Sequence, residues 1–559
     1  MSRKGGALTR NGQRRARLAV IKAVSAQSWP EGLRGWAAAP YLIFCLALAL
    51  RLWGLSFGLP HYFAADEIYK REDALRLAET HFTHRNSQPS FLYNTVYLVF
   101  SIGRLLNPDL TTVQYHYLGR FWMALLGALT VLVLYRLGSV WDRRVGLLAA
   151  LFLAILPLHT ACSRYIKEDI PLTLMATITT LLVVLYLKQP SRPALSLTAL
   201  VAGISFSTKY SGLLLALPLL LALGVSAWRA RREVRAILLD VGLTVIAFGV
   251  GFFLVSPIYL WHPDSLVSGV LGQWKYSATG HHDGIIHNPW SDWWLYYIRT
   301  GLIPGMTWPL FLVSVVGLVL LPRSRDGWII TATAAWLYLV FERGSAKPYP
   351  FSVRYLLPIA PLLCLSAAYA VMVLAGALRR RLPTSTVYGV CFVIAIAPPL
   401  VKSALIADEA VHDTRLAAAA WMEQAIPRGA RLVISEPMMY LPPSRYWDTE
   451  WQTITPDRLA ELFPIRRPDE LPYFVMSSFT YQRYLDSPNA VPWKTSFYSR
   501  IIEEFRLVKE FRPRWLTYGF HSPVIRIYQP RALTRQPSSD VPAARTPAHA
   551  GERARDGDR

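Results

Sequence analysis

Long apolar segments recur along this chain and are separated by short polar or charged stretches. A membrane-spanning helix needs about 20 predominantly apolar residues. Eleven segments approach that length: 38–57, 118–138, 145–161, 170–187, 193–207, 211–227, 236–260, 301–321, 327–342, 355–378 and 386–406. The pattern therefore predicts an α-helical polytopic membrane protein with about 11 transmembrane helices.

A twelfth apolar stretch, residues 91–106, is ambiguous because Asn94 and Arg104 interrupt it. If it does not span, basic residues fall in alternate loops, on the same side as the basic N-terminus. These cations are Arg143, Arg144, Lys188, Arg192, Arg323 and Arg325, with those of 228–235 and 379–381. Cytoplasmic loops carry an excess of Lys and Arg. We therefore predict a helix at the outer interface over 91–106, with Tyr93, Tyr97 and Phe100 at the headgroup level.

The resulting topology predicts four regions in a multi-pass plasma-membrane protein. Residues 1–37 form a basic cytoplasmic N-terminus, and the apolar run after them is a retained anchor. Residues 38–410 form the transmembrane domain, whose long outer loops are 58–117, 261–300 and 342–355. Residues 411–530 form an extracytoplasmic domain, and residues 531–559 form a disordered tail poor in core-forming side chains.

The region 411–530 differs from the rest because short helical and strand patterns alternate in it. Residues 413–426 show helical periodicity, and another helix begins at 481–485. Apolar runs at 431–437, 472–478 and 522–529 are typical of short buried strands. We therefore predict a small α/β domain outside the membrane.

Composition supports the membrane assignment and excludes other classes. The chain is 53% hydrophobic and only 17% charged, whereas a soluble domain carries roughly 25% charged residues. Its formal charge of +23 fits cytoplasmic loops, and no zinc, P-loop or RNA-binding pattern accompanies it, so we expect no nucleic-acid partner. The four cysteines lie in or beside apolar segments and define no disulfide framework.

Candidate chemistry gathers on the predicted outer face. The first outer loop contains the acid pair Asp66 and Glu67, and the turn 159–174 contains Arg164, Lys167, Glu168 and Asp169. Further cations on that face are Lys209, Lys275, Arg343, Lys347 and Arg354. An ionisable residue near a membrane span is costly, so each suggests a functional site. The alternative is an interface carboxylate at Asp66 paired with Lys70 or Arg71, and a snorkelling arginine at Arg354.

This set of charges suits transfer from a donor whose leaving group is a lipid phosphate. Arg and Lys bind the phosphate and stabilise the charge that develops as it departs. A carboxylate acts as base toward the attacking hydroxyl or amine, or orients it. A lipid-linked donor enters from the bilayer, so such a site belongs at the membrane interface.

Several motifs together resemble the GT-C glycosyltransferases, most closely the family-39 type. The family includes protein O-mannosyltransferases, the lipid A aminoarabinose transferase and related bacterial enzymes that use polyprenyl-phosphate sugars. The first outer loop opens with an acid pair, and a turn containing SRY and ED follows the third span. Other similar stretches are 203–218, 254–264, 352–363 and 413–435, so the resemblance covers roughly 38–530.

The resemblance implies a hexosyl- or pentosyltransferase that inverts the sugar carbon as polyprenyl phosphate leaves. Asp66 matches the family's first-loop acid, the base or acceptor-orienting group, with Glu67 as its neighbour. Asp169 matches the acid of the second turn, for which Glu168 competes. The donor phosphate is expected to contact Arg354, Lys347, Lys209 and Arg164.

The loop 280–290 leaves two alternatives open. His281, His282 and Asp283 are candidates to contact substrate, or to bind a divalent cation. Adjacent histidines rarely ligate one ion together, so we expect no required cofactor. The first outer loop lacks the His-Pro-Pro stretch of protein O-mannosyltransferases and has NSQPSFLYN at 86–94 instead. The acceptor thus stays open among a cell-envelope glycan, a lipid and a protein.

A transporter or flippase of lipid-linked sugars is the alternative from another class. Such proteins show internal repeats and interrupted half-helices at matching positions of their two halves. The sequence shows no such symmetry, and the C-terminal domain favours an enzyme. An outer-face ligase or polymerase of envelope glycans would share the fold and differ only in its acceptor.

Overall fold

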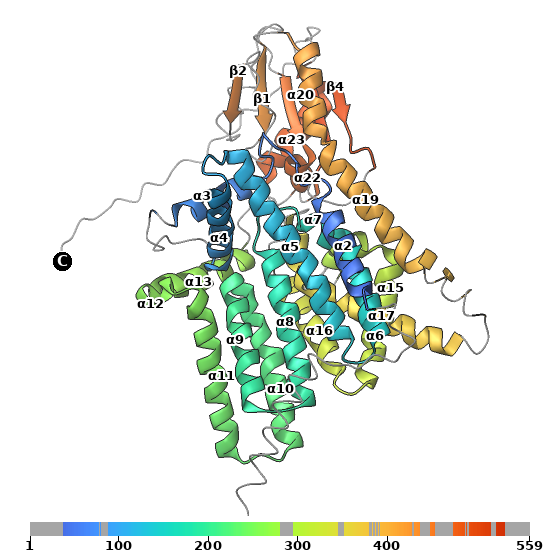
Figure 1. The fold of residues 1–559 in the computed structure, drawn as a ribbon. Coiled ribbons are helices and arrows are strands. Elements are labelled where there is room, and N and C mark those ends of the chain that lie inside the picture. Colours follow the sequence, from blue (N-terminus) through green and yellow to red (C-terminus); the bar gives the residue numbers. More distant parts are fainter. Residues whose placement is uncertain are drawn as a thin grey trace, which may run out of the picture.

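A computed structural model describes most of the chain as a helical bundle with a β-sheet at one end (Figure 1). The described residues are 37–77, 79, 88–279, 295–344, 351–378, 383, 386, 389–390, 392–427, 430–435, 448–452, 473–486, 488, 491–515 and 521–530. The end that carries the sheet is the sheet end of the molecule. The opposite end carries the loop between α10 (Ala216–Arg229) and α11 (Val234–Val255), where Arg231 and Arg232 lie, with Arg229 and Arg235 in the adjoining helix ends.

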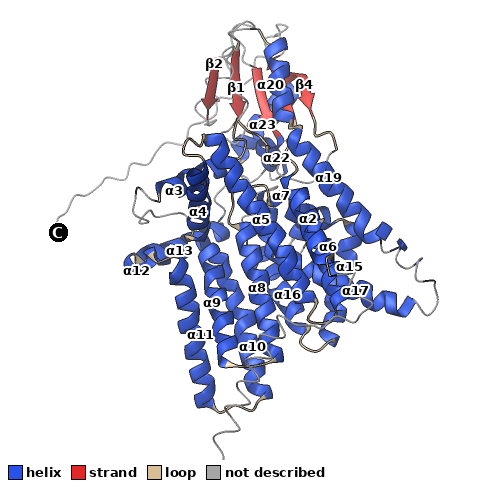
Figure 2. Ribbon diagram, viewed as in Figure 1, coloured by secondary structure: helices blue, strands red, loops and turns tan. Residues whose placement is uncertain are grey.

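The regular elements described in the N-terminal half are all helices, joined by turns and loops (Figure 2). Its elements, with η2 a 3-10 helix, are α2 (Ala39–Leu52), α3 (Ala65–Arg76), α4 (Phe91–Leu106), α5 (Thr112–Gly138), α6 (Arg143–Ala154), α7 (Pro157–Cys162), α8 (Asp169–Lys188), α9 (Arg192–Thr208), η2 (Tyr210–Leu215), α10 (Ala216–Arg229), α11 (Val234–Val255), α12 (Ile258–Trp261) and α13 (Pro263–Thr279).

The rest of the bundle contains shorter and more broken helices. Its elements, of which η3 and η6 are π-helices and η4 and η5 are 3-10 helices, are η3 (Ile298–Leu302), α14 (Ile303–Met306), α15 (Trp308–Leu320), η4 (Leu321–Arg323), α16 (Trp328–Arg343), η5 (Phe351–Ile359), α17 (Ala360–Leu378), η6 (Phe392–Ile396) and α19 (Ala397–Val411).

Five of the described helical segments are long and apolar enough to cross a membrane. They are Thr112–Gly138, Asp169–Lys188, Tyr210–Arg229, Val234–Val255 and Ser352–Ala377, and a sixth results if the pair Ile298–Met306 and Trp308–Arg323, bent by 105°, is one span. The predicted membrane class is confirmed, but the count of eleven is not. One reason is that predicted spans are broken, as 145–161 is between α6 and α7, where Pro157 begins a new helix.

The predicted interface segment 91–106 forms α4 with the predicted bounds, but two of the three aromatic residues expected at the headgroup level face inward. Tyr93 and Phe100 are fully buried. Phe100 packs against Tyr115 of α5, with ring centroids 5.0 Å apart. The expectation that these two rings lie among lipid headgroups is therefore wrong, because the outward face of α4 carries Leu98, Ile102, Leu105 and Leu106 instead.

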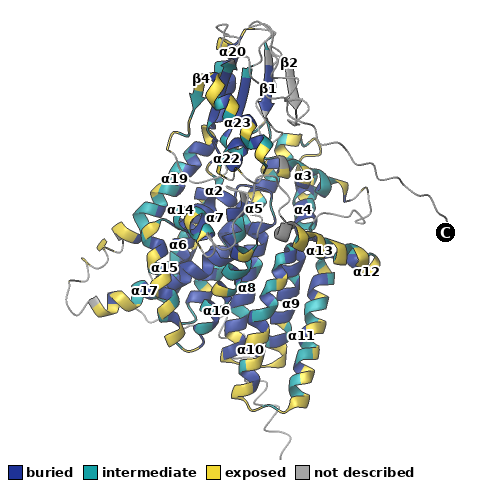
Figure 3. Ribbon diagram, turned by 180° about the vertical axis from the view of Figure 1, so that it is seen from behind, coloured by how far each residue is buried: buried dark blue, intermediate teal, exposed yellow. Residues whose placement is uncertain are grey.

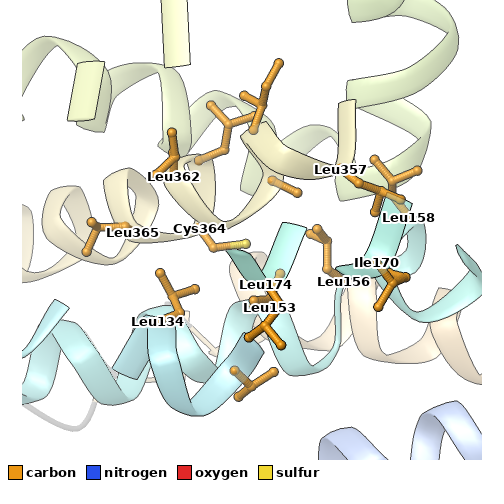
Figure 4. Close-up of a cluster of buried hydrophobic side chains, with 14 of the residues drawn as sticks. Leu134, Leu153, Leu156, Leu158, Ile170, Leu174, Leu357, Leu362, Cys364 and Leu365 are labelled. Atoms are coloured by element: carbon orange, nitrogen blue, oxygen red, sulfur yellow. The ribbon is translucent and has the colours of Figure 1, made fainter. Parts of the chain in front are cut away.

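The core of the bundle is made of aliphatic side chains from several helices and is buried throughout (Figures 3 and 4). Figure 4 shows part of this core, a cluster of buried side chains that includes Leu134, Leu153, Ile170, Leu174 and Leu365 of α5, α6, α8 and α17. Elsewhere small residues bring helix backbones close together. A Cβ atom on Gly203 of α9 would lie 2.0 Å from the carbonyl oxygen of Phe248 in α11. Such glycines allow tight helix packing in membranes.

The predicted C-terminal α/β unit contains a mixed five-stranded sheet in the order β2-β1-β3-β5-β4. Its strands are β1 (Arg431–Ser435), β2 (Asp448–Gln452), β3 (Tyr473–Ser477), β4 (Phe505–Phe511) and β5 (Ile525–Pro530). β1 pairs in parallel with β2 and β3, whereas β5 is antiparallel to β3 and β4. Helices α20 (Thr414–Ala425), α22 (Ser478–Asp486) and α23 (Pro492–Glu504) accompany it. The sequence predicted β1, β3 and β5 but missed β2, which is largely polar, and β4, whose apolar residues are interrupted by charged ones.

Candidate functional site

Four chain segments bring charged side chains together at the sheet end of the bundle. Asp66 lies in the first turn of α3, and Asp169 lies in the first turn of α8. Lys209 stands between α9 and η2, and Arg354 lies within η5. These segments are far apart in the sequence, so the tertiary fold alone makes them neighbours.

Ion pairs join these residues into one group. Asp66 Oδ2 lies 2.5 Å from Lys167 Nζ and 3.8 Å from Arg354 Nη2. Arg354 Nε lies 3.4 Å from Asp169 Oδ2, and Lys209 Nζ lies 2.7 Å from Asp169 Oδ1. Arg354 therefore bridges the two acids that the sequence analysis singled out.

A neighbouring pair extends the group. Lys70 of α3 lies 2.5 Å from Glu168 Oε1 and donates a hydrogen bond to the Tyr93 hydroxyl. We name the charge cluster as Asp66, Lys70, Lys167, Glu168, Asp169, Lys209 and Arg354. It contains three carboxylates and four cations, so one positive charge is in excess. Such an excess favours an anionic ligand.

The acids of the charge cluster differ in how far their side chains are exposed. The side chain of Asp66 is 53% exposed, whereas those of Glu168 and Asp169 are 4% exposed. Asp66 is therefore the carboxylate that a molecule from outside can reach. The predicted alternative partners of Asp66 are engaged elsewhere, because Lys70 pairs with Glu168, and Arg71 contacts Glu72 and His116.

The cations determine the ionisation of Asp66. Partial burial by itself would raise the pKa of its carboxyl group, but Lys167 and Arg354 outweigh this effect. The pKa of Asp66 therefore lies below its ordinary value, and the group is negatively charged at neutral pH. Burial and the nearby Arg354 lower the pKa of Lys167.

Glu67 points away from the accessible group and into the protein. Its carboxylate accepts two hydrogen bonds from Arg120, of 2.9 and 2.6 Å, and one of 3.0 Å from the backbone N–H of Ile166. Arg120 also donates to the carbonyl oxygens of Leu55 and Phe57. Both side chains are buried, so this ion pair fastens α3 to α5.

Arg120 was not among the site residues predicted from the sequence. It lies inside the predicted span 118–138, and an arginine within an apolar helix is a recognised sign of a specific role. The charge of Arg120 was therefore visible in the sequence. Its partner Glu67 was not, because 53 residues separate the two.

Arg164 has a different position from the one expected of a phosphate-binding residue. It is fully buried and donates to the carbonyl oxygens of Trp53 and Leu50, at 2.7 and 2.8 Å. Arg51, also fully buried, donates to the carbonyl oxygens of Leu153 and Ala154 at the end of α6. Both arginines thus satisfy backbone carbonyls at helix ends, which intrahelical bonds leave free.

The remaining candidates lie outside the described residues. These are Lys347, His281, His282 and Asp283. Among the residues that the structure describes, no group of three or more His, Cys, Asp or Glu side chains could hold a metal ion. The expectation for the loop 280–290 therefore stays a prediction.

Comparison with known proteins gives one family match. Residues 116–261 match the model of the dolichyl-phosphate-mannose-protein mannosyltransferase family. No curated protein matches the chain. The matched segment covers α5 to α12, which include Arg120, the turn 163–168, Asp169 and Lys209. This match confirms the predicted resemblance to GT-C glycosyltransferases.

Solved structures are similar over most of the chain at low sequence identity. ArnT from Cupriavidus metallidurans bound to undecaprenyl phosphate is 16% identical, covers 88% of this chain and 98% of that chain, and gives a TM-score of 0.47. The oligosaccharyltransferase of Archaeoglobus fulgidus with zinc and sulfate is 13% identical. That match covers 87% of this chain and 72% of that chain, with a TM-score of 0.47. AglB from Archaeoglobus fulgidus, in complex with an inhibitory peptide and a dolichol-phosphate, is 13% identical. That match covers 84% of this chain and 72% of that chain, with a TM-score of 0.49.

Proposed function

We propose that this membrane protein is a glycosyltransferase that moves a sugar from a polyprenyl-phosphate donor to an acceptor. The observation that supports this most directly is the charge cluster, where a surplus of cations surrounds one accessible carboxylate. The family match over 116–261 supports the same class. The sugar that it moves is a hexose or a pentose.

The cations of the charge cluster form the donor side of the proposed site. Arg354, Lys209 and Lys167 surround Asp66 and Asp169, and their side chains are 21%, 14% and 15% exposed. Arg354 Nε is buried and has no hydrogen-bond partner among the described residues, although Asp169 lies 3.4 Å away. A phosphate oxygen would supply that partner. Lys347 remains a proposed fourth contact, whereas the backbone bonds of Arg164 favour a supporting role.

Asp66 faces the acceptor in this proposal. The acceptor hydroxyl or amine attacks the sugar carbon, and the bond from that carbon to the phosphate oxygen breaks. Polyprenyl phosphate leaves with the electron pair, and the sugar carbon is inverted, as the family resemblance implies. The low pKa of Asp66 favours orientation of the acceptor N–H or O–H over strong proton abstraction, because a weakly basic carboxylate accepts a proton poorly. The acceptor proton then passes to the departing phosphate. Asp169 holds Arg354 and Lys209 in place.

The sheet end faces outward in the proposed topology. Arg229, Arg231, Arg232 and Arg235 lie at the opposite end, which the positive-inside rule places in the cytoplasm. The charge cluster and the C-terminal sheet then share the extracytoplasmic side, where a lipid-linked donor supplies the energy of transfer.

The test of this function is release of polyprenyl phosphate by the purified full-length protein. A panel of undecaprenyl-phosphate sugars is offered with an extract of envelope lipids and glycans as acceptors. Acceptor-dependent release together with a labelled glycosylated product supports the proposal. Movement of intact donor across a vesicle membrane without release would instead support a flippase. Repeating the assay with a chelator tests the expectation that no cofactor is required.

A further inference from the structure

Helix α13 presents one of its faces to the protein. Leu266 and Val270 pack against the aromatic cluster of Phe206, Tyr210, Phe252 and Tyr259. Gly269 lies so close that a Cβ atom on it would be 2.1 Å from the Tyr210 hydroxyl oxygen. Gln273 Oε1 accepts a hydrogen bond of 2.7 Å from Gln88. These contacts fix how the helix is rotated about its own axis.

A second face of α13 is apolar and exposed. Val267, Leu271 and Trp274 are 58%, 58% and 71% exposed, and their spacing of four and three residues aligns them along one side of the helix. Among the described residues nothing packs over this side. A third face carries Asp264, Ser268 and Lys275, which are exposed polar residues. The exposed part of the helix, outside its protein-facing side, is therefore amphipathic.

The apolar face continues a surface that already suits lipid. Helix α11 is a candidate membrane span of which only 22% is buried, and Val245, Ile246, Val250 and Leu254 are exposed along it. Leu260 and Trp261 follow at its sheet end, 57% and 71% exposed. Figures 1 and 3 show α12 and α13 running sideways from that end of α11, with much of their outer surface exposed.

We propose that α13 lies in the membrane interface, in the leaflet nearer the sheet end, with Val267, Leu271 and Trp274 inserted among the lipids. Interfacial helices bury their apolar face at the boundary of headgroups and acyl chains and keep a polar face in water. Trp and Lys are both common at this level. The helix predicted for this role was 91–106, but α13 has the required separation of polar and apolar faces, whereas the exposed face of α4 is apolar.

This placement would hold the charge cluster at a defined depth. Gly269 packs on Tyr210, the residue after Lys209, and Lys209 pairs with Asp169. Gln88 ties α13 to the segment that leads into α4, where Tyr93 accepts from Lys70. The charge cluster would then stand at headgroup level. The relevance of this depth to a lipid-linked donor rests on the proposed function, whereas the contact of α13 with lipid does not.

The test places a photoreactive p-benzoyl-phenylalanine in full-length protein embedded in nanodiscs of phosphatidylethanolamine and phosphatidylglycerol. It replaces Leu271 in one variant, Val267 in a second, and Ser268 on the polar face as the matched control. All three side chains are exposed, so folding should be retained, and a single symmetric peak in size-exclusion chromatography checks this.

We expect lipid adducts, identified by mass spectrometry, to be severalfold more abundant at 271 and 267 than at 268. Equal yields at the three positions would overturn the proposal, and so would crosslinks from 271 to a second copy of the chain. No sugar transfer is measured, so a failure here leaves the proposed glycosyltransferase activity standing, and the converse also holds.

Discussion

At the scale of single residues, Asp66 differs from the other acids of the charge cluster because a ligand can reach it. Its side chain is 53% exposed, while Lys167 and Arg354 hold it in place. Asp169 and Glu168 are buried under their cations, and Glu67 is bound by Arg120. The proposed division of labour follows, with Asp66 facing the acceptor and the others maintaining the arrangement.

Replacing Asp66 by Asn should lower the rate of transfer by roughly 10²-fold or more, because the acceptor loses the charge that orients it. The rate is measured as release of undecaprenyl phosphate. Asp109→Asn is the matched control, since it makes the same change at an exposed residue beyond α4, and it should leave the rate unchanged. Equal rates for Asp66→Asn and the wild-type protein would remove Asp66 from the mechanism.

The dependence of transfer on pH follows from the ionisation of Asp66. A carboxyl group whose pKa lies below its ordinary value stays charged as the pH falls, and loses its charge only below the usual range of about 4. The rate kcat/KM should therefore show no loss due to Asp66 between pH 7 and about pH 5. A tenfold loss per pH unit within that interval, measured at constant donor concentration, would contradict the assignment.

At the scale of elements, α9 and α11 pack at the distance that glycine allows. A Cβ on Gly203 would meet the Phe248 carbonyl at 2.0 Å, and one on Gly251 would meet the Leu200 carbonyl at 2.0 Å. Backbone atoms cannot yield as a flexible side chain can, so the helices would have to separate. This contact supports the position of Lys209, which follows α9 directly.

Gly203→Ala should therefore destabilise the protein by about 2 kcal/mol, within the usual cost of overpacking. Gly242→Ala on α11 is the control, because a Cβ there has no atom within 4 Å. Alanine favours a helix over glycine by roughly 0.5–1 kcal/mol, so the control should be neutral or slightly stabilising. Thermal unfolding in detergent, followed by the loss of the monodisperse peak, separates the two outcomes. A similar midpoint for both variants would show that α9 and α11 tolerate separation.

In the sheet, Glu510 of β4 stands opposite Arg526 of β5 and contacts it at 2.6 Å. Burial would raise the pKa of Glu510, but its hydrogen bonds to Arg526 and Arg512 lower it overall. A carboxyl group with a lowered pKa stabilises the folded state at neutral pH, and this contribution is lost as the pH falls below the unfolded value of about 4.3.

Glu510→Gln should lower the free energy of unfolding by about 0.2–1 kcal/mol, the usual contribution of a cross-strand pair. The readout is hydrogen exchange of the β5 amides, which should become faster at pH 7 in the variant. Glu504→Gln, at an exposed pair with Arg500, is the control and should have little effect on β5. If the two variants exchange alike, the ion pair on the sheet does not stabilise β5.

At the scale of the whole molecule, charge is distributed unevenly between the two ends. The loop between α10 and α11 carries arginines, and the opposite end carries the charge cluster and the sheet. The proposed orientation makes a direct prediction. A cysteine introduced as Glu504→Cys should react with an impermeant maleimide on intact cells, and Arg231→Cys should react only after the cells are broken.

Cys45 is exposed in the structure, so its labelling in the parent protein is subtracted as the background. Reaction of Arg231→Cys in intact cells would reverse the orientation, because the loop between α10 and α11 would then lie outside. Reaction of both variants only in broken cells would place the sheet in the cytoplasm and remove the premise of an extracytoplasmic site.

The sequence by itself determined the membrane class, most helix positions and the main candidate residues of the site. Long apolar runs must leave water, and charged residues at their ends are conspicuous, so Asp66, Asp169, Lys209 and Arg354 could be selected without coordinates. It also predicted three of the strands, those with buried apolar patterns. Strand β2 was not predicted because its residues are largely polar, and β4 was not predicted because charged residues interrupt its apolar ones and most of its side chains are not buried. A strand held by pairing with its neighbours needs no continuous apolar pattern of its own.

Only the tertiary structure decided which charges meet. Glu67 and Asp66 are adjacent in sequence, yet the helical turn of α3 directs one carboxylate to Arg120 and the other to Lys167 and Arg354. Arg164 was expected at the phosphate, but its partners are the carbonyls of Leu50 and Trp53. Partners more than 50 residues apart are selected by packing, which apolar periodicity does not encode. Packing also determines the exposed side of α13. Because one face of this helix lies against Tyr210, the side with Val267, Leu271 and Trp274 is left for the proposed lipid contact.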